Sequence, residues 1–310
     1  MAMATVNTAW DYVSGNIFKT WVILILFSLF VMGVIYIFAR AWGFDEIGGL
    51  GILGLAFIVT GVMNFFSYFY SDKIVLAASG AKPVTMQNNP QIYRLVENLS
   101  IASGLPMPKV YTIDDSAPNA FATGRDPKHA AIAFTTGILE KLDKLELEGV
   151  TAHELSHIGN RDTLVMSVTS VLVGTIALVA DWFLRSLWFG GSDDRDSKGN
   201  AIFMGLALVA AILAPIVATL IQLAVSRRRE FLADASGVIL TRNPDGLAKA
   251  LLKISADTEP LEVANRGTAH MYIANPLKGS TAVGWFSGLF NTHPPMAERI
   301  KALREMEGLA

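Results

Sequence analysis

The strongest chemical signal in this sequence is the pentapeptide His153-Glu154-Leu155-Ser156-His157. In a helix, side chains four residues apart lie on the same face, so both imidazoles can reach one Zn²⁺. Zinc lowers the pKa of a bound water, and Glu154 is close enough to accept that proton and pass it to a leaving amine. Apolar neighbours and a total of only five histidines argue against a merely solvated helix face. The motif therefore predicts one catalytic zinc ion per chain.

The third metal ligand has to come from elsewhere in the chain, and a pair of acidic residues is the candidate source. A catalytic zinc takes three protein ligands and keeps one position open. Glu230 and Asp234 stand four residues apart in the segment SRRREFLAD. One carboxylate can bind the metal while the other accepts the remaining N–H of a ligand imidazole. A solvated face paired with the neighbouring arginines explains the same pattern equally well, so the residues alone leave both interpretations open.

The composition indicates a membrane protein. Of 310 residues, 52% are hydrophobic and 17% charged, with a mean hydropathy of +0.42, whereas soluble domains carry about 25% charged residues. A spanning helix needs roughly 20 apolar residues. Four segments meet this requirement, namely residues 21–39, 47–71, 163–180 and 201–225. The third is the least clear, because the charged residues Asp181 and Arg185 follow it closely.

Other classes of protein are excluded by charge and by cysteine content. A net charge of −2 gives no basic excess for binding nucleic acid. Without cysteine, the chain has no disulfides, no cysteine nucleophile and no thiolate ligand for zinc. The partners that remain are the lipid bilayer and a protein substrate.

The order of the segments predicts the organisation of the chain. We expect a transmembrane hairpin over residues 1–71, a first protease part over 72–162, a second hairpin over 163–225 and a second protease part over 226–310. Four spans place both polar parts on one side, which the lysines and arginines near the span ends indicate is the cytoplasm. Short strands are expected at 109–113 and 130–134, and helices at 137–160, 244–258 and 295–307.

These motifs together resemble the HtpX family of membrane-integrated zinc metalloproteases, relatives of the eukaryotic CAAX prenyl protease. The resemblance rests on the four-span layout and on AHELSHIGNRD, SRRREFLAD, NAFATG and NTHPP. It implies a mainly α membrane protein with a gluzincin-like α+β protease domain and a small sheet. It further implies that Glu230 is the third zinc ligand and that Asp234 orients a ligand histidine. The implied function is cleavage of damaged or misfolded proteins in the cytoplasmic membrane, as part of a stress response.

Two further sites follow from this resemblance. His293, in Thr-His-Pro-Pro, matches the position of a histidine that stabilises the oxyanion of the transition state; its alternative is a residue at the entry of a helix. A second segment matches the edge strand along which such enzymes bind the substrate backbone, with a surface hairpin as the alternative. Its residues are Asn119, Ala120, Phe121, Ala122, Thr123 and Gly124.

The spacing also places the metal relative to the membrane. His157 precedes the third apolar segment by six residues, and Glu230 follows the fourth by five. At 1.5 Å per residue, the ligands lie within about 10 Å of the span ends.

Two rival functions remain: a prenyl-peptide processing enzyme, and a catalytically silent transporter or scaffold with a structural metal. The intact Glu154 argues against the second, because a structural site needs no general base.

Overall fold

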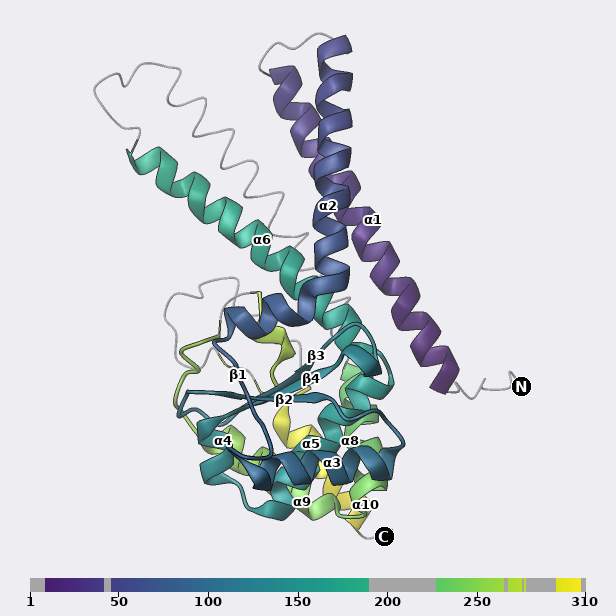
Figure 1. Cartoon of the computed structure of the whole chain (residues 1–310), viewed down its shortest axis with the longest axis vertical. Helices are drawn as coiled ribbons and strands as arrows, with labels where there is room; N and C mark the ends of the chain where they lie inside the picture. The colour runs from purple at the N-terminus through teal and green to yellow at the C-terminus, as the bar shows by residue number, and fades with distance from the viewer. Residues whose placement is uncertain are drawn as a thin grey trace.

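The computed structural model describes residues 9–41, 46–189, 227–264, 267–274, 276 and 294–307. Three long apolar helices extend from one end of a mixed α/β domain (Figure 1). They are α1 (Ala9–Ala41), α2 (Glu46–Ala78) and α6 (Asp162–Phe189). The chain is therefore mostly helical with a small sheet, as expected.

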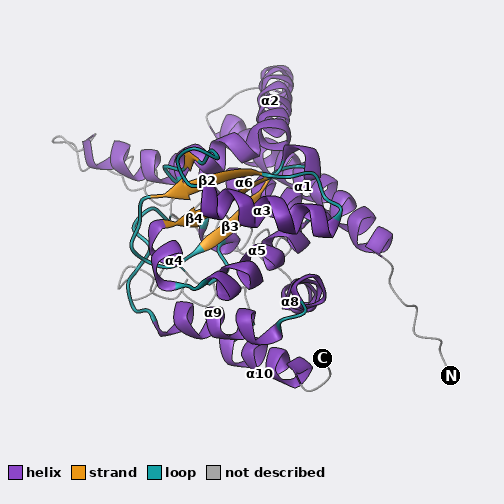
Figure 2. Cartoon of the chain, turned by 60° about the horizontal axis from the view of Figure 1, so that its bottom comes forward, coloured by secondary structure: helices purple, strands orange, loops and turns teal. Residues whose placement is uncertain are grey.

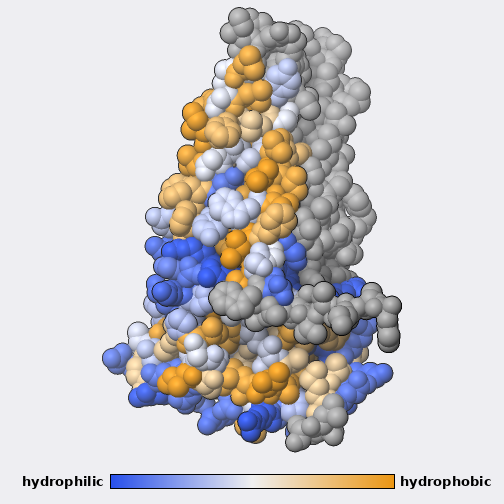
Figure 3. All heavy atoms as spheres, turned by 90° about the vertical axis from the view of Figure 1, so that its right-hand side faces the viewer, coloured by the Kyte–Doolittle hydropathy of each residue, from blue (hydrophilic) through white to orange (hydrophobic). Residues whose placement is uncertain are grey.

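Two of these helices are long and apolar enough to cross a membrane. The apolar stretches are Asp11–Gly33 on α1 and Leu50–Ala78 on α2, while α6 has a shorter one, Asp162–Ala177. Large apolar side chains cover the outer surface of the helices (Figure 3), and Leu55, Phe57 and Ile58 are each more than 60% exposed. Such a surface needs a nonpolar environment. The predicted fourth span, residues 201–225, lies outside the described residues.

The domain contains a four-stranded sheet in the order β1-β2-β4-β3. Strand β1 (Lys82–Pro83) is antiparallel to β2 (Lys109–Ile113), which runs parallel to β4 (Ala131–Thr135). Strand β3 (Ala120–Thr123) pairs antiparallel with β4, with Phe121 opposite Ala133. Both strands predicted from the sequence are present, and β3 forms one end of the sheet.

Six helices make up the rest of the described domain. They are α3 (Pro90–Ser103), α4 (Thr136–Lys141), α5 (Lys144–Gly159), α8 (Arg227–Thr241), α9 (Pro244–Ala256) and α10 (Met296–Glu307). Short 3₁₀ helices occur at Pro127–His129 and Ala269–Met271.

The prediction of a single helix over residues 137–160 is wrong, because the helix is interrupted between the end of α4 and the start of α5. Asp143 begins α5 with a capping box: its side chain accepts a hydrogen bond from the Glu146 amide, and the Glu146 side chain accepts one from the Asp143 amide. This reciprocal bonding satisfies two N–H groups that a continuous helix would pair internally. The apolar spacing alone concealed the new helix start.

Helix α5 lies between the sheet on one side and α8 and α9 on the other (Figure 2). The two helix contacts depend on glycine. A Cβ at Gly149 would lie 2.8 Å from the Leu247 nitrogen of α9, and one at Gly237 of α8 would lie 3.2 Å from the His153 nitrogen. Because neither residue has a side chain, α8 and α9 pack directly against the backbone of α5.

Candidate metal centre

Helix α5 carries His153, Glu154 and His157 on a buried surface at its C-terminal half. The helix ends at Gly159 with Asn160 as its C-cap, and Arg161 adopts a left-handed conformation with φ of 59° before α6 begins at Asp162. Residues other than glycine seldom adopt this conformation. The sharp turn brings the first residue of α6 back beside the last turn of α5.

His153, His157 and Glu230 form the potential metal-binding group found among the described residues. The two Nε2 atoms lie 3.1 Å apart. Glu230, from α8, places Oε1 3.5 Å from His157 Nε2 and Oε2 3.8 Å from His153 Nε2. All three side chains are almost completely buried. The structure thus brings together the three ligands expected from the sequence.

Two carboxylates orient the imidazole rings. Asp234 Oδ1 lies 3.0 Å from His153 Nδ1, and Asp162 Oδ2 lies 2.9 Å from His157 Nδ1. A carboxylate only accepts hydrogen bonds, so each Nδ1 carries a proton and donates it. When both rings are neutral, as metal binding requires, the lone pair of each is on Nε2, facing the other ring and Glu230. The two Nε2 lone pairs and the Glu230 carboxylate then point to one place, which is the arrangement that a bound metal ion requires.

Both spacing and charge fit a divalent metal. Nitrogen ligands about 2.0–2.1 Å from a tetrahedral zinc are about 3.3 Å from one another, which is close to the 3.1 Å between the two Nε2 atoms. Four buried carboxylates and two buried guanidinium groups surround the group, so that with every carboxylate ionised and both histidines neutral two negative charges remain for a dication to neutralise. The charged residues are Glu154, Asp162, Glu230, Asp234, Arg229 and Arg299.

Arg299 of α10 connects the candidate ligand Glu230 to Asp234. Its Nε and Nη2 bind the two oxygens of Asp234 at 2.8 and 2.6 Å. Its Nη1 lies 3.3 Å from Glu230 Oε2 and donates to the Ile273 carbonyl at 3.3 Å. Burial opposes the charge of this guanidinium, yet the adjacent Asp234 raises the pKa of Arg299 above its ordinary value. The side chain is therefore a permanent cation inside the centre.

The acid–base properties of the centre follow from the same surroundings. Burial raises the pKa of Glu154 to about 7, with the charge of Glu230 acting in the same direction. Burial opposes the charge of His157, but Asp162 and Glu230 more than compensate and raise its pKa to about 9. Burial lowers the pKa of His153. In the metal-free centre, Glu154 therefore holds a proton more tightly than an exposed glutamate does.

Strand β3 lies directly beside Glu154. The backbone N–H of Ala122 donates a hydrogen bond to the Glu154 carboxylate. Asn119, just before β3, exchanges hydrogen bonds with the backbone of Ala274 at 3.1 and 3.4 Å. The segment predicted to bind substrate therefore borders the catalytic base.

The outer edge of β3 is bonded to other parts of the chain in this structure. The Ile273 amide donates to the Ala120 carbonyl at 3.1 Å, and the Gly124 amide donates to Ser167 Oγ at 3.2 Å. All of the strand residues are buried. A substrate that pairs along the whole strand has to replace these bonds, and the role of Asn119–Gly124 in binding stays a prediction.

Comparison with known proteins identifies the family. The sequence model of peptidase family M48 matches residues 86–307, which include all the residues of the metal centre described above. The chain belongs to peptidase family M48. It is 45% identical over 299 residues to a protease HtpX homolog of Dictyoglomus thermophilum, covering 96% of this chain and 95% of the relative. A protease HtpX homolog of Pyrococcus furiosus is 47% identical over 262 residues, covering 84% and 88%.

Among solved structures, S. mikatae Ste24p matches with a TM-score of 0.48 at 19% identity, covering 92% of this chain and 66% of that chain. Membership of family M48 makes the chain a metallopeptidase. The resemblance seen in the sequence is thereby confirmed.

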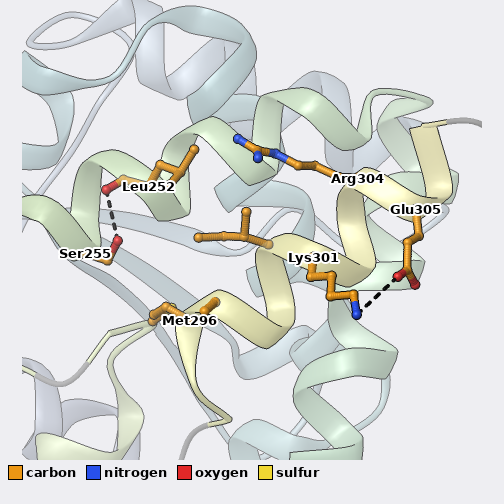
Figure 4. A pocket seen from close by; sticks show the side chains of 8 residues that line it. Leu252, Ser255, Met296, Lys301, Arg304 and Glu305 are labelled. Atoms are coloured by element: carbon orange, nitrogen blue, oxygen red, sulfur yellow. Dashed lines mark hydrogen bonds and ion pairs between the residues drawn. The ribbon is translucent and has the colours of Figure 1, made fainter.

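Two other features of this M48 peptidase concern possible sites. His293 lies outside the described residues, so its role as an oxyanion donor stays a prediction. A surface pocket of about 580 Å³ between α9 and α10 contains no residue of the metal centre (Figure 4). Its walls are formed by Leu252, Ser255, Met296, Ala297, Ile300, Lys301, Arg304 and Glu305.

The sequence did not predict several residues of this M48 centre. Asp162 follows His157 by five residues, a spacing that a continuous helix would place elsewhere. Arg229 entered only as one of the arginines beside Glu230 on a possible solvated face, yet it is buried and its Nη1 lies 3.2 Å from Asp162 Oδ1. Arg299 appeared only as one polar residue of a terminal helix. In each case, a tertiary contact determines the function.

Proposed function

We propose that this protein is a zinc-dependent endopeptidase of the cytoplasmic membrane that cleaves damaged or misfolded membrane proteins. The observation that carries the proposal is the convergence of His153 Nε2, His157 Nε2 and the Glu230 carboxylate beside the buried Glu154. Two imidazoles and one carboxylate form a ligand set typical of catalytic zinc, with the fourth position left for water or substrate. Relatives named protease HtpX homolog support the same reaction.

The residues of the chain divide the reaction between them. Zinc bound to the three ligands would polarise the scissile carbonyl and activate a water molecule. Glu154 accepts the proton of the attacking water on its carboxylate and donates it to the leaving amine. Asp234 and Asp162 hold the ligand rings in place. We assign oxyanion stabilisation to His293 and binding of the substrate backbone to Asn119–Gly124.

The apolar helices support a substrate within or attached to the membrane. Asp162, a partner of His157, is the first residue of the apolar helix α6. A single hydrogen bond, between His157 and Asp162, thus connects the metal centre to α6. This helix extends out of the protease domain together with the other apolar helices. We propose four spans in total, with residues 201–225 as the fourth, gluzincin-like packing of the protease domain, and the active site facing the cytoplasm.

The substitution Glu154→Gln tests the proposed reaction. Glutamine keeps the size of the side chain but cannot accept a proton, so zinc content should equal that of the wild type. Cleavage of a membrane protein substrate should fall by about 100- to 10,000-fold. Unchanged cleavage would overturn the role of Glu154 as the general base. Comparison of cleaved protein termini in native membranes, with and without this substitution, identifies the substrates.

A further inference from the structure

One side chain of the first apolar helix reaches the metal centre. Asn16 of α1 is 3% exposed. Its amide nitrogen donates to Asp162 Oδ1 at 2.7 Å and to the Asn160 carbonyl at 2.9 Å, and its oxygen accepts from Arg229 Nη1 at 3.0 Å. Polar groups inside apolar helices are costly to bury, and those present usually have a function. The partners of this amide indicate which function.

The contacts of Asn16 lead to two of the metal ligands. Asp162 uses its second oxygen, Oδ2, to accept from His157 Nδ1 at 2.9 Å. Arg229 directly precedes Glu230 on α8. A single amide from α1 thus joins the end of α5, the start of α6 and the first turn of α8. These are the segments whose relative positions determine the geometry of the centre.

We infer that Asn16 is a positioning residue of the metal centre, acting on His157 through Asp162. With Asn16 bound to Oδ1 and His157 to Oδ2, the Asp162 carboxylate is engaged on both sides and cannot rotate freely. Among the residues that the structure describes, removing the amide leaves Oδ1 with Arg229 as its remaining hydrogen-bond partner, at 3.2 Å. The orientation of His157, and with it the metal affinity, therefore depends on the docking of α1. This inference rests on the proposed metal site.

The substitution Asn16→Leu removes the amide and keeps a side chain of similar size. The matched control is Asn64→Leu on α2. The Asn64 amide is also partly buried, but it donates to Ser28 Oγ and the Leu24 carbonyl of α1, within the apolar helices. Zinc affinity is measured by chelator competition on the full chain in detergent. We expect a loss of up to about tenfold for Asn16→Leu, below the 10- to 100-fold typical of a direct partner of a ligand. The control should stay within about twofold of the wild type.

A double-mutant cycle distinguishes positioning from a general structural effect. If Asn16 acts through Asp162, then Asn16→Leu should change zinc affinity little when Asp162→Asn is already present. Additive losses would overturn the inference, as would equal losses in Asn16→Leu and Asn64→Leu, or wild-type affinity in Asn16→Leu. If Asn16→Leu does not fold, Asn16→Ala replaces it and is judged by the same outcomes. Failure of the wild type to bind zinc would instead overturn the proposed function.

Discussion

Replacing Asp234 with asparagine should weaken both the fold and the metal site. The carboxylate binds His153 Nδ1 at 3.0 Å and receives two hydrogen bonds from Arg299, at 2.6 and 2.8 Å. Breaking a buried ion pair by removing one partner costs about 3–5 kcal/mol of stability. Losing a group that orients a metal ligand lowers metal affinity about 10- to 100-fold. Asparagine preserves the shape, so these losses report the missing charge.

Arg299 determines where in that range the loss of zinc affinity falls. Its Nη1 already lies 3.3 Å from Glu230 Oε2, so a guanidinium released from Asp234 can pair with the ligand carboxylate and compete with the metal. The matched variant is Asp162→Asn, where Arg229 keeps the oxygen of Asn16 as its partner. We therefore expect a loss near 100-fold for Asp234→Asn and near tenfold for Asp162→Asn.

Chelator competition gives the zinc affinities of both variants, and thermal unfolding in excess chelator gives their metal-free stability. A loss in Asp162→Asn equal to or greater than that in Asp234→Asn would refute competition by Arg299. An Asp234→Asn variant that unfolds at the wild-type temperature without metal would refute the contribution of the buried ion pair.

Three further outcomes are expected. Because the pKa of His157 is about 9 without metal and zinc needs the neutral ring, zinc affinity should fall about tenfold per unit as the pH drops below 9; a flat titration would contradict this. His293→Phe should lower kcat about 100- to 1,000-fold with KM and zinc content unchanged, whereas a large rise in KM would indicate substrate binding. Cysteines introduced at Ser192 and Ser255, in a chain without native cysteine, should be labelled from opposite sides of the membrane; labelling of both from one side would exclude four spans.

The sequence predicted the parts of the centre that depend on local spacing. His153 and His157 are four residues apart, so helical periodicity alone places them on one face. The ends of α3 carry local signals of the same kind: the Asn89 side chain, just before Pro90, caps the first turn, and Gly104 ends the helix with φ of 70°. Such signals require no knowledge of tertiary structure.

The remaining contacts depend on packing between distant segments. Asn16 and Asp162 are hydrogen-bonded although they are 146 positions apart, and Arg299 meets Asp234 across 65 positions. In the sequence, Asn16 is one polar residue near an apolar segment, and nothing local distinguishes it from Asn64. Glu230 and Asp234 were ambiguous for the same reason, until the family resemblance and then the fold gave them partners.

The separation of the ligands between α5 and α8 has a consequence for how the enzyme is made. Glu230 follows His157 by 73 positions, with α6 and the fourth apolar segment, residues 201–225, between them in the sequence. At a synthesis rate of about 5–20 residues per second, the third ligand is translated about 4–15 s after the first two. During that interval the nascent chain has two histidines but an incomplete metal site. With Glu230 as the proposed third ligand, the peptidase can acquire activity only after the intervening apolar segments have been synthesised.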